Sequence, residues 1–69
     1  MKKYAIKLTK NNQEKILATY ANAEDAFFYG GKVSNELPKS AGTVSCIYAD
    51  FDDEDNRTDK IYQLIKVWM

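Results

Sequence analysis

The chain has 69 residues, with ten basic and ten acidic side chains, one cysteine and no histidine. This length predicts a single small domain over residues 1–69, which buries only about 60% of the surface that its unfolded form exposes. A single cysteine excludes an internal disulfide and fits a reducing, cytoplasmic compartment, and the absence of histidine excludes the usual Cys/His zinc sites. Association with another subunit remains as a source of additional stability.

The charges cancel overall but are segregated along the chain. The first fifteen residues hold five lysines against Glu14, whereas residues 50–59 hold six carboxylates against Arg57. We therefore expect a dipolar molecule. No apolar run approaches the ~20 residues that a membrane span requires, and the residues after Lys2 and Lys3 alternate in polarity instead of forming an apolar signal core. Neither membrane insertion nor export is expected.

Two strands are predicted near the N-terminus, over residues 4–8 and 15–21. In the first, Tyr4, Ile6 and Leu8 alternate with Ala5 and Lys7, which is the pattern of a half-buried strand. Asn11 to Gln13 is interpreted as a three-residue turn, because Asn tolerates a positive φ. The resulting register places Lys10 opposite Glu14, Leu8 opposite Ile16, Ile6 opposite Ala18 and Tyr4 opposite Tyr20, with Lys3, Lys7, Thr9, Lys15 and Thr19 on the other face.

A helix is predicted between Asn22 and Pro38. Asn22 is a good N-cap, Glu24 and Asp25 lie where the helix dipole favours carboxylates, and Pro38 ends the helix. The pair Gly30–Gly31 costs about 1 kcal/mol per glycine in a helix interior. We expect one continuous helix in which the missing side chains allow close approach to the sheet, with an apolar face formed by Ala26, Gly30, Val33 and Leu37.

Two further strands are predicted over residues 43–51 and 60–69, both rich in β-branched and aromatic residues. The acidic stretch between them is interpreted as the loop of a second hairpin. The order ββαββ predicts an α+β fold with two layers: a four-stranded antiparallel sheet and one helix packed on one of its faces.

The second hairpin is apolar on both faces, although one helix covers only one of them. Strict alternation directs Ile61, Ile65, Val67 and Met69 to one face and Tyr62, Leu64 and Trp68 to the other. An uncovered aromatic face favours a binding partner. Our leading hypothesis is a non-catalytic protein-interaction module that forms a homodimer through Tyr48, Tyr62, Leu64 and Trp68.

The acidic stretch does not fit a calcium-binding EF-hand loop, because Asp55 stands where glycine is needed and Ile61 where glutamate is needed. A solvated turn is the simplest interpretation. The alternative is that the stretch imitates a nucleic-acid backbone and inhibits or regulates a nucleic-acid-handling protein, a role that suits phage or mobile-element proteins. The contact residues would be Asp50, Asp52, Asp53, Glu54, Asp55 and Asp59.

A second alternative is single-stranded nucleic-acid binding by a sheet face that combines lysines with Tyr62 and Trp68. The lysines are Lys3, Lys7, Lys15, Lys60 and Lys66. The net charge of zero argues against it, since sheets that bind nucleic acid are usually basic. Cys46 has no histidine to activate it as a nucleophile. The sequence therefore predicts no enzymatic activity, no cofactor and no metal site.

Overall fold

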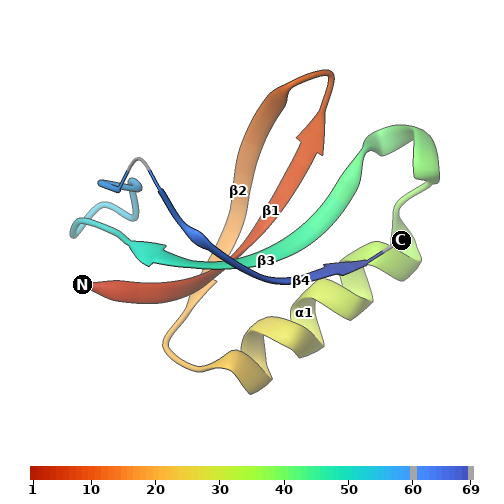
Figure 1. Ribbon diagram of the computed structural model, residues 1–69. Helices are drawn as coiled ribbons and strands as arrows, with labels where there is room; N and C mark the ends of the chain where they lie inside the picture. The colour runs from red at the N-terminus through yellow and green to blue at the C-terminus, as the bar shows by residue number, and fades with distance from the viewer. Residues whose placement is uncertain (60, 69) are drawn as a thin grey trace.

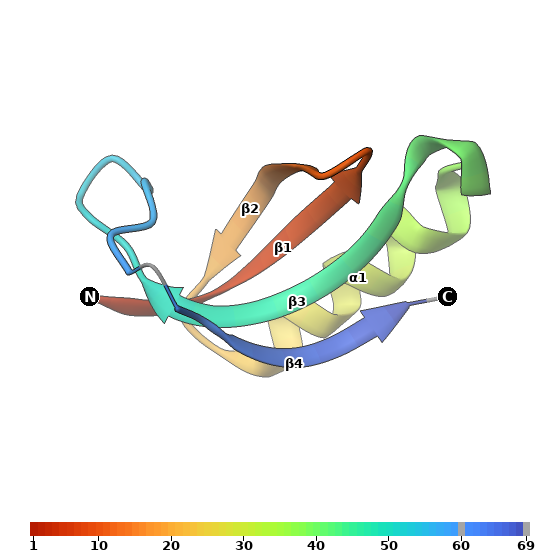
Figure 2. The same cartoon turned by 45° about the horizontal axis from the view of Figure 1, so that its top comes forward.

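The computed structural model describes residues 1–59 and 61–68 and has the predicted order of elements (Figure 1). The elements are β1 (Lys2–Lys10), β2 (Gln13–Tyr20), α1 (Ala23–Glu36), the short 3-10 helix η1 (Lys39–Ala41), β3 (Thr43–Asp50) and β4 (Gln63–Trp68). The four strands form one antiparallel sheet in the order β2-β1-β3-β4. One helix covers one face of the sheet, so the α+β, two-layer prediction is confirmed (Figure 2).

The first hairpin has a tighter turn than predicted. Asn11 and Asn12 alone form it, with φ of 53° and 65°, which is the positive-φ pair of a type I′ turn. Lys10 therefore pairs with Gln13 and Leu8 with Lys15, so this part of the predicted register is wrong. A bulge at Leu17 then restores the predicted pairs, Ile6 with Ala18 and Tyr4 with Tyr20.

The bulge in β2 decides which side chains reach which face. Leu17 packs with the core under the helix, and Ile16 packs on the opposite face of the sheet. We call that opposite face, which the helix does not cover, the open face. Lys15 pairs with Leu8, whose side chain lies on the helix side, so Lys15 does not share the open face with Lys7.

The helix begins and ends as the sequence predicts. The Asn22 side-chain oxygen accepts a hydrogen bond of 2.9 Å from the backbone N–H of Asp25. At the other end, the backbone of Leu37 is extended and Pro38 follows. The buried positions Ala26, Gly30 and Val33 share one face, and the helix is continuous through both glycines.

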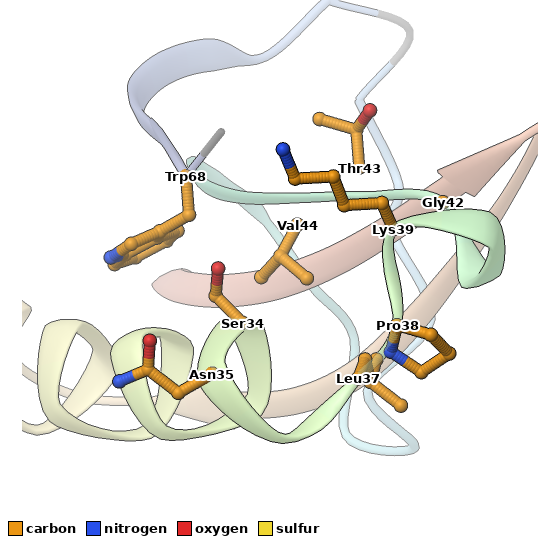
Figure 3. Close-up of a pocket in the computed structure, with 9 residues that line it drawn as sticks. All are labelled: Ser34, Asn35, Leu37, Pro38, Lys39, Gly42, Thr43, Val44 and Trp68. Atoms are coloured by element: carbon orange, nitrogen blue, oxygen red, sulfur yellow. The ribbon is translucent and has the colours of Figure 1, made fainter.

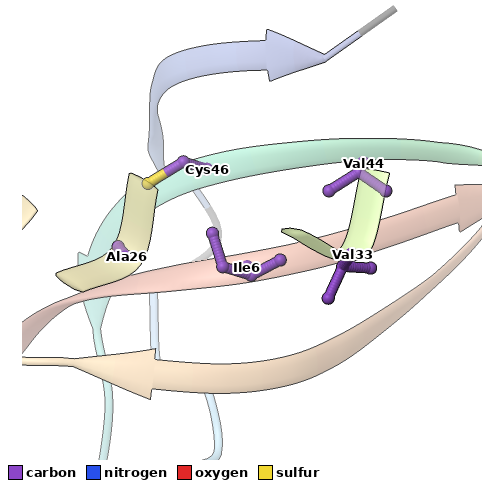
Figure 4. Close-up of a cluster of buried hydrophobic side chains, with 5 residues drawn as sticks. All are labelled: Ile6, Ala26, Val33, Val44 and Cys46. Atoms are coloured by element: carbon purple, nitrogen blue, oxygen red, sulfur yellow. The ribbon is translucent and has the colours of Figure 1, made fainter. Parts of the chain in front are cut away.

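Two apolar clusters stabilise the sheet from its two faces. The helix-side core contains Ile6, Ala26, Val33, Val44 and Cys46 (Figure 4). The open-face cluster contains Ala5, Ile47, Ala49 and Phe51, with Ile16 and Tyr62 packed against it. The burial of this second cluster without a helix above it means that side chains from the loops and strands themselves cover it.

Strand β4 is shorter than predicted and bulged. It begins at Gln63, and Lys60 and Met69 lie outside the described residues. Cys46 pairs with Lys66 and Ile47 with Leu64, so Ile65 is the extra residue of a bulge. The predicted alternation is therefore wrong: Ile65 and Trp68 pack on the helix-side core, whereas Tyr62 packs on the open-face cluster.

Within the described residues, no helix is long and apolar enough to cross a membrane.

Candidate interaction surfaces

The four residues predicted to form one interaction face lie on two faces of the sheet. Tyr48 stacks on Tyr4 on the helix side, with 4.6 Å between ring centroids. Trp68 is on the same side and lies against Gly30 of the helix. Tyr62 and Leu64 belong to the open face instead. The bulge at Ile65, which strict alternation does not anticipate, is the reason that the predicted face is divided.

The large apolar side chains left exposed on β4 form a different surface. Leu64 pairs with Ile47 and Val67 with Ser45, so both project from the open face. Ile61, just before the strand, is also exposed. Because β4 is the last strand of the sheet, these residues border a free strand edge. We call Ile61, Leu64 and Val67 the β4 edge patch.

A buried lysine lies at the centre of the open face. Lys7 is only 5% exposed, and its Nζ donates hydrogen bonds to the Tyr62 hydroxyl and to Glu14 Oε1, the latter at 2.8 Å. The Tyr62 hydroxyl donates in turn to Glu14 Oε1 at 3.2 Å. The Arg57 guanidinium carbon lies 4.7 Å from the Tyr62 ring centroid. We call these four residues the Lys7 cluster.

Hydrogen bonding between Lys7 and Glu14 favours the charged form of each. Burial by itself would lower the pKa of Lys7, but the hydrogen bonds to Glu14 and Tyr62 outweigh it and raise the pKa above its ordinary value. The hydrogen bond from Lys7 is the main cause that lowers the pKa of Glu14. Lys7 and Glu14 therefore do not resemble an acid–base pair that exchanges a proton near neutral pH. Their role is structural, because they join Tyr62 to β1 and β2.

The acidic loop, residues 50–59, is folded and not merely solvated. Phe51 is buried in the open-face cluster. Asp52 organises the turn, since its Oδ1 accepts backbone hydrogen bonds from Glu54 and Asn56, each at 2.9 Å. Hydrogen bonding, chiefly from the backbone N–H of Asn56, lowers the pKa of Asp52. The ion pair between Lys3 and Asp55, at 2.8 Å, ties the loop to β1.

Most carboxylates of the loop have partners within the chain. Asp50 forms an ion pair of 2.7 Å with the amino group of Met1. Asp59 accepts a backbone hydrogen bond of 3.1 Å from Asp50. In the described part of the chain, Asp53 and Glu54 are the loop residues whose carboxylates accept no hydrogen bond and form no ion pair. An acidic contact through this loop would therefore depend on these two, which weakens the hypothesis of a nucleic-acid mimic.

The five lysines of the predicted basic face are also dispersed. Lys3 and Lys7 are paired with carboxylates on the open face. Lys15 lies on β2, and Lys66, on β4, stands over the Trp68 ring on the helix side, 5.3 Å from its centroid. Lys60 lies outside the described residues. No single surface collects the described lysines, which weakens the hypothesis of nucleic-acid binding by this set.

Among the grooves lined by the described residues, two adjoin the edge strands of the sheet. The first, of about 550 Å³, lies between the end of α1, the start of β3 and the end of β4 (Figure 3). Trp68 stands on one side and Lys39 on the other. The C-terminal end of a helix favours cations whereas Lys39 favours anions, so the electrostatics of this groove select neither. The second groove, of about 520 Å³, lies between β2 and the acidic loop.

Among residues 1–59 and 61–68, no three carboxylate or thiol groups come together as a metal site would need.

No protein-family model, curated protein or solved structure matches this chain. No local pattern in the sequence indicates the Lys7 cluster, because its members are separated by up to 55 positions along the chain.

Proposed function

We propose that the chain is a non-catalytic protein-interaction module that forms a homodimer through strand β4. The observation that carries this proposal is the exposure of the β4 edge patch: Ile61 is 85% exposed, Leu64 55% and Val67 37%. Large apolar side chains beside a free strand edge are typical of a surface that another chain covers. The opposite edge begins with the polar residues Gln13, Glu14 and Lys15, so it is a poorer candidate for an apolar interface.

An antiparallel pair of β4 strands would provide partners for the patch. A two-fold axis perpendicular to the sheet keeps the open faces of both copies on the same side. If Leu64 lies opposite Val67 of the second copy, the interface contains two such apolar pairs, one on each side of the axis. The same register places residues of the helix side opposite each other: Gln63 with Trp68, and Ile65 with Lys66. Every pair thus joins side chains of one face, as cross-strand packing requires.

Light scattering coupled to size-exclusion chromatography tests the proposal. The wild-type chain should be dimeric at high micromolar concentration and dissociate on dilution. Leu64→Lys should weaken the dimer about 100-fold. The two-fold axis places the new charge in the interface twice, and each copy should cost about 1.4 kcal/mol, which corresponds to a tenfold loss of affinity.

Phe28→Lys is the matched control. Phe28 is 79% exposed, but it projects from the helix and not from β4. Its substitution removes a similar apolar side chain and adds the same charge, so the dimer should persist. A wild-type chain that stays monomeric at millimolar concentration would refute the proposal, as would equal weakening by both substitutions.

A further inference from the structure

Strand β2 and the acidic loop together form a groove that has a free strand edge on one side. All six residues from Glu14 to Thr19 line it, and Glu54 to Arg57 line the opposite wall. Side chains of consecutive strand residues point to opposite faces, so what these six share along the groove is their backbone. Because β2 ends the sheet and pairs with β1 within the described chain, its outward N–H and C=O groups are directed toward this groove.

The wall of the groove is held in place by contacts to the sheet. Asp55 is paired with Lys3 at 2.8 Å, and Arg57 lies 3.9 Å from the second carboxylate oxygen of Glu14. Asp52 holds the turn from within through its bonds to Glu54 and Asn56. A strand edge beside a fixed wall is the arrangement that proteins use to capture an extended peptide as an additional strand.

The side chains around the groove indicate what such a peptide would carry. The carboxylate of Glu54, in the wall, has no partner in the described part of the chain, whereas the cation of the wall, Arg57, lies over the Tyr62 ring and near Glu14. On the other face of β2, half-buried Leu17 offers an apolar contact. Lys15 also lines the groove, but it pairs with Leu8 and so projects to the helix side of β2. A basic side chain of the peptide beside Glu54 therefore does not face Lys15.

We propose that this groove binds an extended segment of another protein in which basic and apolar side chains alternate, and that the segment pairs with β2 as a fifth strand. The basic side chains point to the open face, where Glu54 lies in the wall, and the apolar side chains point to the other face, beside Leu17. The acidic loop then acts as the wall of a peptide-binding groove, and the Glu54 carboxylate selects the charge of the ligand.

The acetylated and amidated hexapeptide KVKVKV is a suitable probe. Titration followed by amide hydrogen exchange should show binding that protects the outward N–H groups of residues 14–19 and weakens with added salt. Glu54→Lys should reduce the affinity about fivefold, as expected for reversal of one exposed charge pair. Glu36→Lys, the same change at an exposed position of α1 outside the groove, should leave the affinity within twofold.

Two control peptides separate strand pairing from simple charge attraction. A hexapeptide N-methylated at alternate residues on its pairing edge should lose binding, because it cannot donate the ladder hydrogen bonds. The acidic hexapeptide EVEVEV should not bind. The proposal is overturned if the N-methylated peptide binds as well as KVKVKV, if protection appears on β4 instead of β2, or if KVKVKV does not bind at low salt.

Discussion

Two adjacent glycines illustrate how strongly the environment of a single residue decides its role. A Cβ added at Gly30 would lie 2.4 Å from the Trp68 ring, closer than non-bonded atoms approach, whereas one added at Gly31 would lie 3.8 Å from Trp68 Nε1. Gly30 therefore provides the space in which the indole ring packs on the helix. Gly31 provides none, and it only lowers the helix propensity of its position.

The two glycines should respond to alanine with opposite signs. Gly30→Ala forces the half-buried Trp68 ring to move and should lower the free energy of unfolding by about 1–3 kcal/mol, despite the better helix propensity of alanine. Gly31→Ala adds an ordinary contact and should raise it by up to about 1 kcal/mol. Urea denaturation followed by circular dichroism measures both changes. Equal effects of the two substitutions would contradict the packing of Trp68 against Gly30.

At the scale of the element, tight turns and bulges set the faces of the strands. The type I′ turn at Asn11 and Asn12 shifts the first hairpin by one residue, and the bulge at Leu17 shifts it back. A similar bulge at Ile65 turns both Ile65 and Trp68 toward the helix. Each bulge increases the local twist of an edge strand, and each moves apolar side chains to the face where they can be buried.

The first turn can be tested at Asn12, whose φ of 65° is costly for most residues. Asn12→Ala should lower the free energy of unfolding by about 1–2 kcal/mol, because a Cβ without a polar side chain disfavours the left-handed conformation. Asn12→Gly should preserve or increase stability, since Asn-Gly is a preferred type I′ sequence. Urea denaturation of the two variants compares them directly. A three-residue turn, as the sequence analysis predicted, would not produce this difference.

At the scale of the whole molecule, the Lys7 cluster joins segments that are remote in sequence. Lys7 of β1, Glu14 of β2 and Tyr62 meet on the open face, and Arg57 of the acidic loop lies over the Tyr62 ring. The cluster thereby helps to hold the acidic loop, which forms the wall of the β2 groove. It also holds Tyr62, the residue that immediately precedes β4. Together with the Lys3–Asp55 and Met1–Asp50 ion pairs, these contacts hold the acidic loop against the sheet.

The contribution of the cluster should depend on pH. The pKa of Glu14 is lowered from its ordinary value of 4.5, so its stabilising contribution is complete above that value and is lost as the pH falls through the lower, folded-state pKa. The loss of unfolding free energy between pH 7 and strongly acidic pH should be smaller in Glu14→Gln than in the wild type. Urea denaturation across that range measures it. An unchanged loss would show that Glu14 is not held by Lys7.

The sequence by itself determined the order of the elements, both ends of the helix and its buried face, because these depend on local signals such as the Asn22 cap, Pro38 and helical spacing. It also located the acidic and basic segments. Only the tertiary structure decided which strand residues share a face, why Lys7 is buried, and which loop carboxylates have partners among the described residues. Strand pairing and ion pairing join residues distant along the chain, and a bulge of one residue reverses a face. No pattern of neighbouring residues encodes that choice.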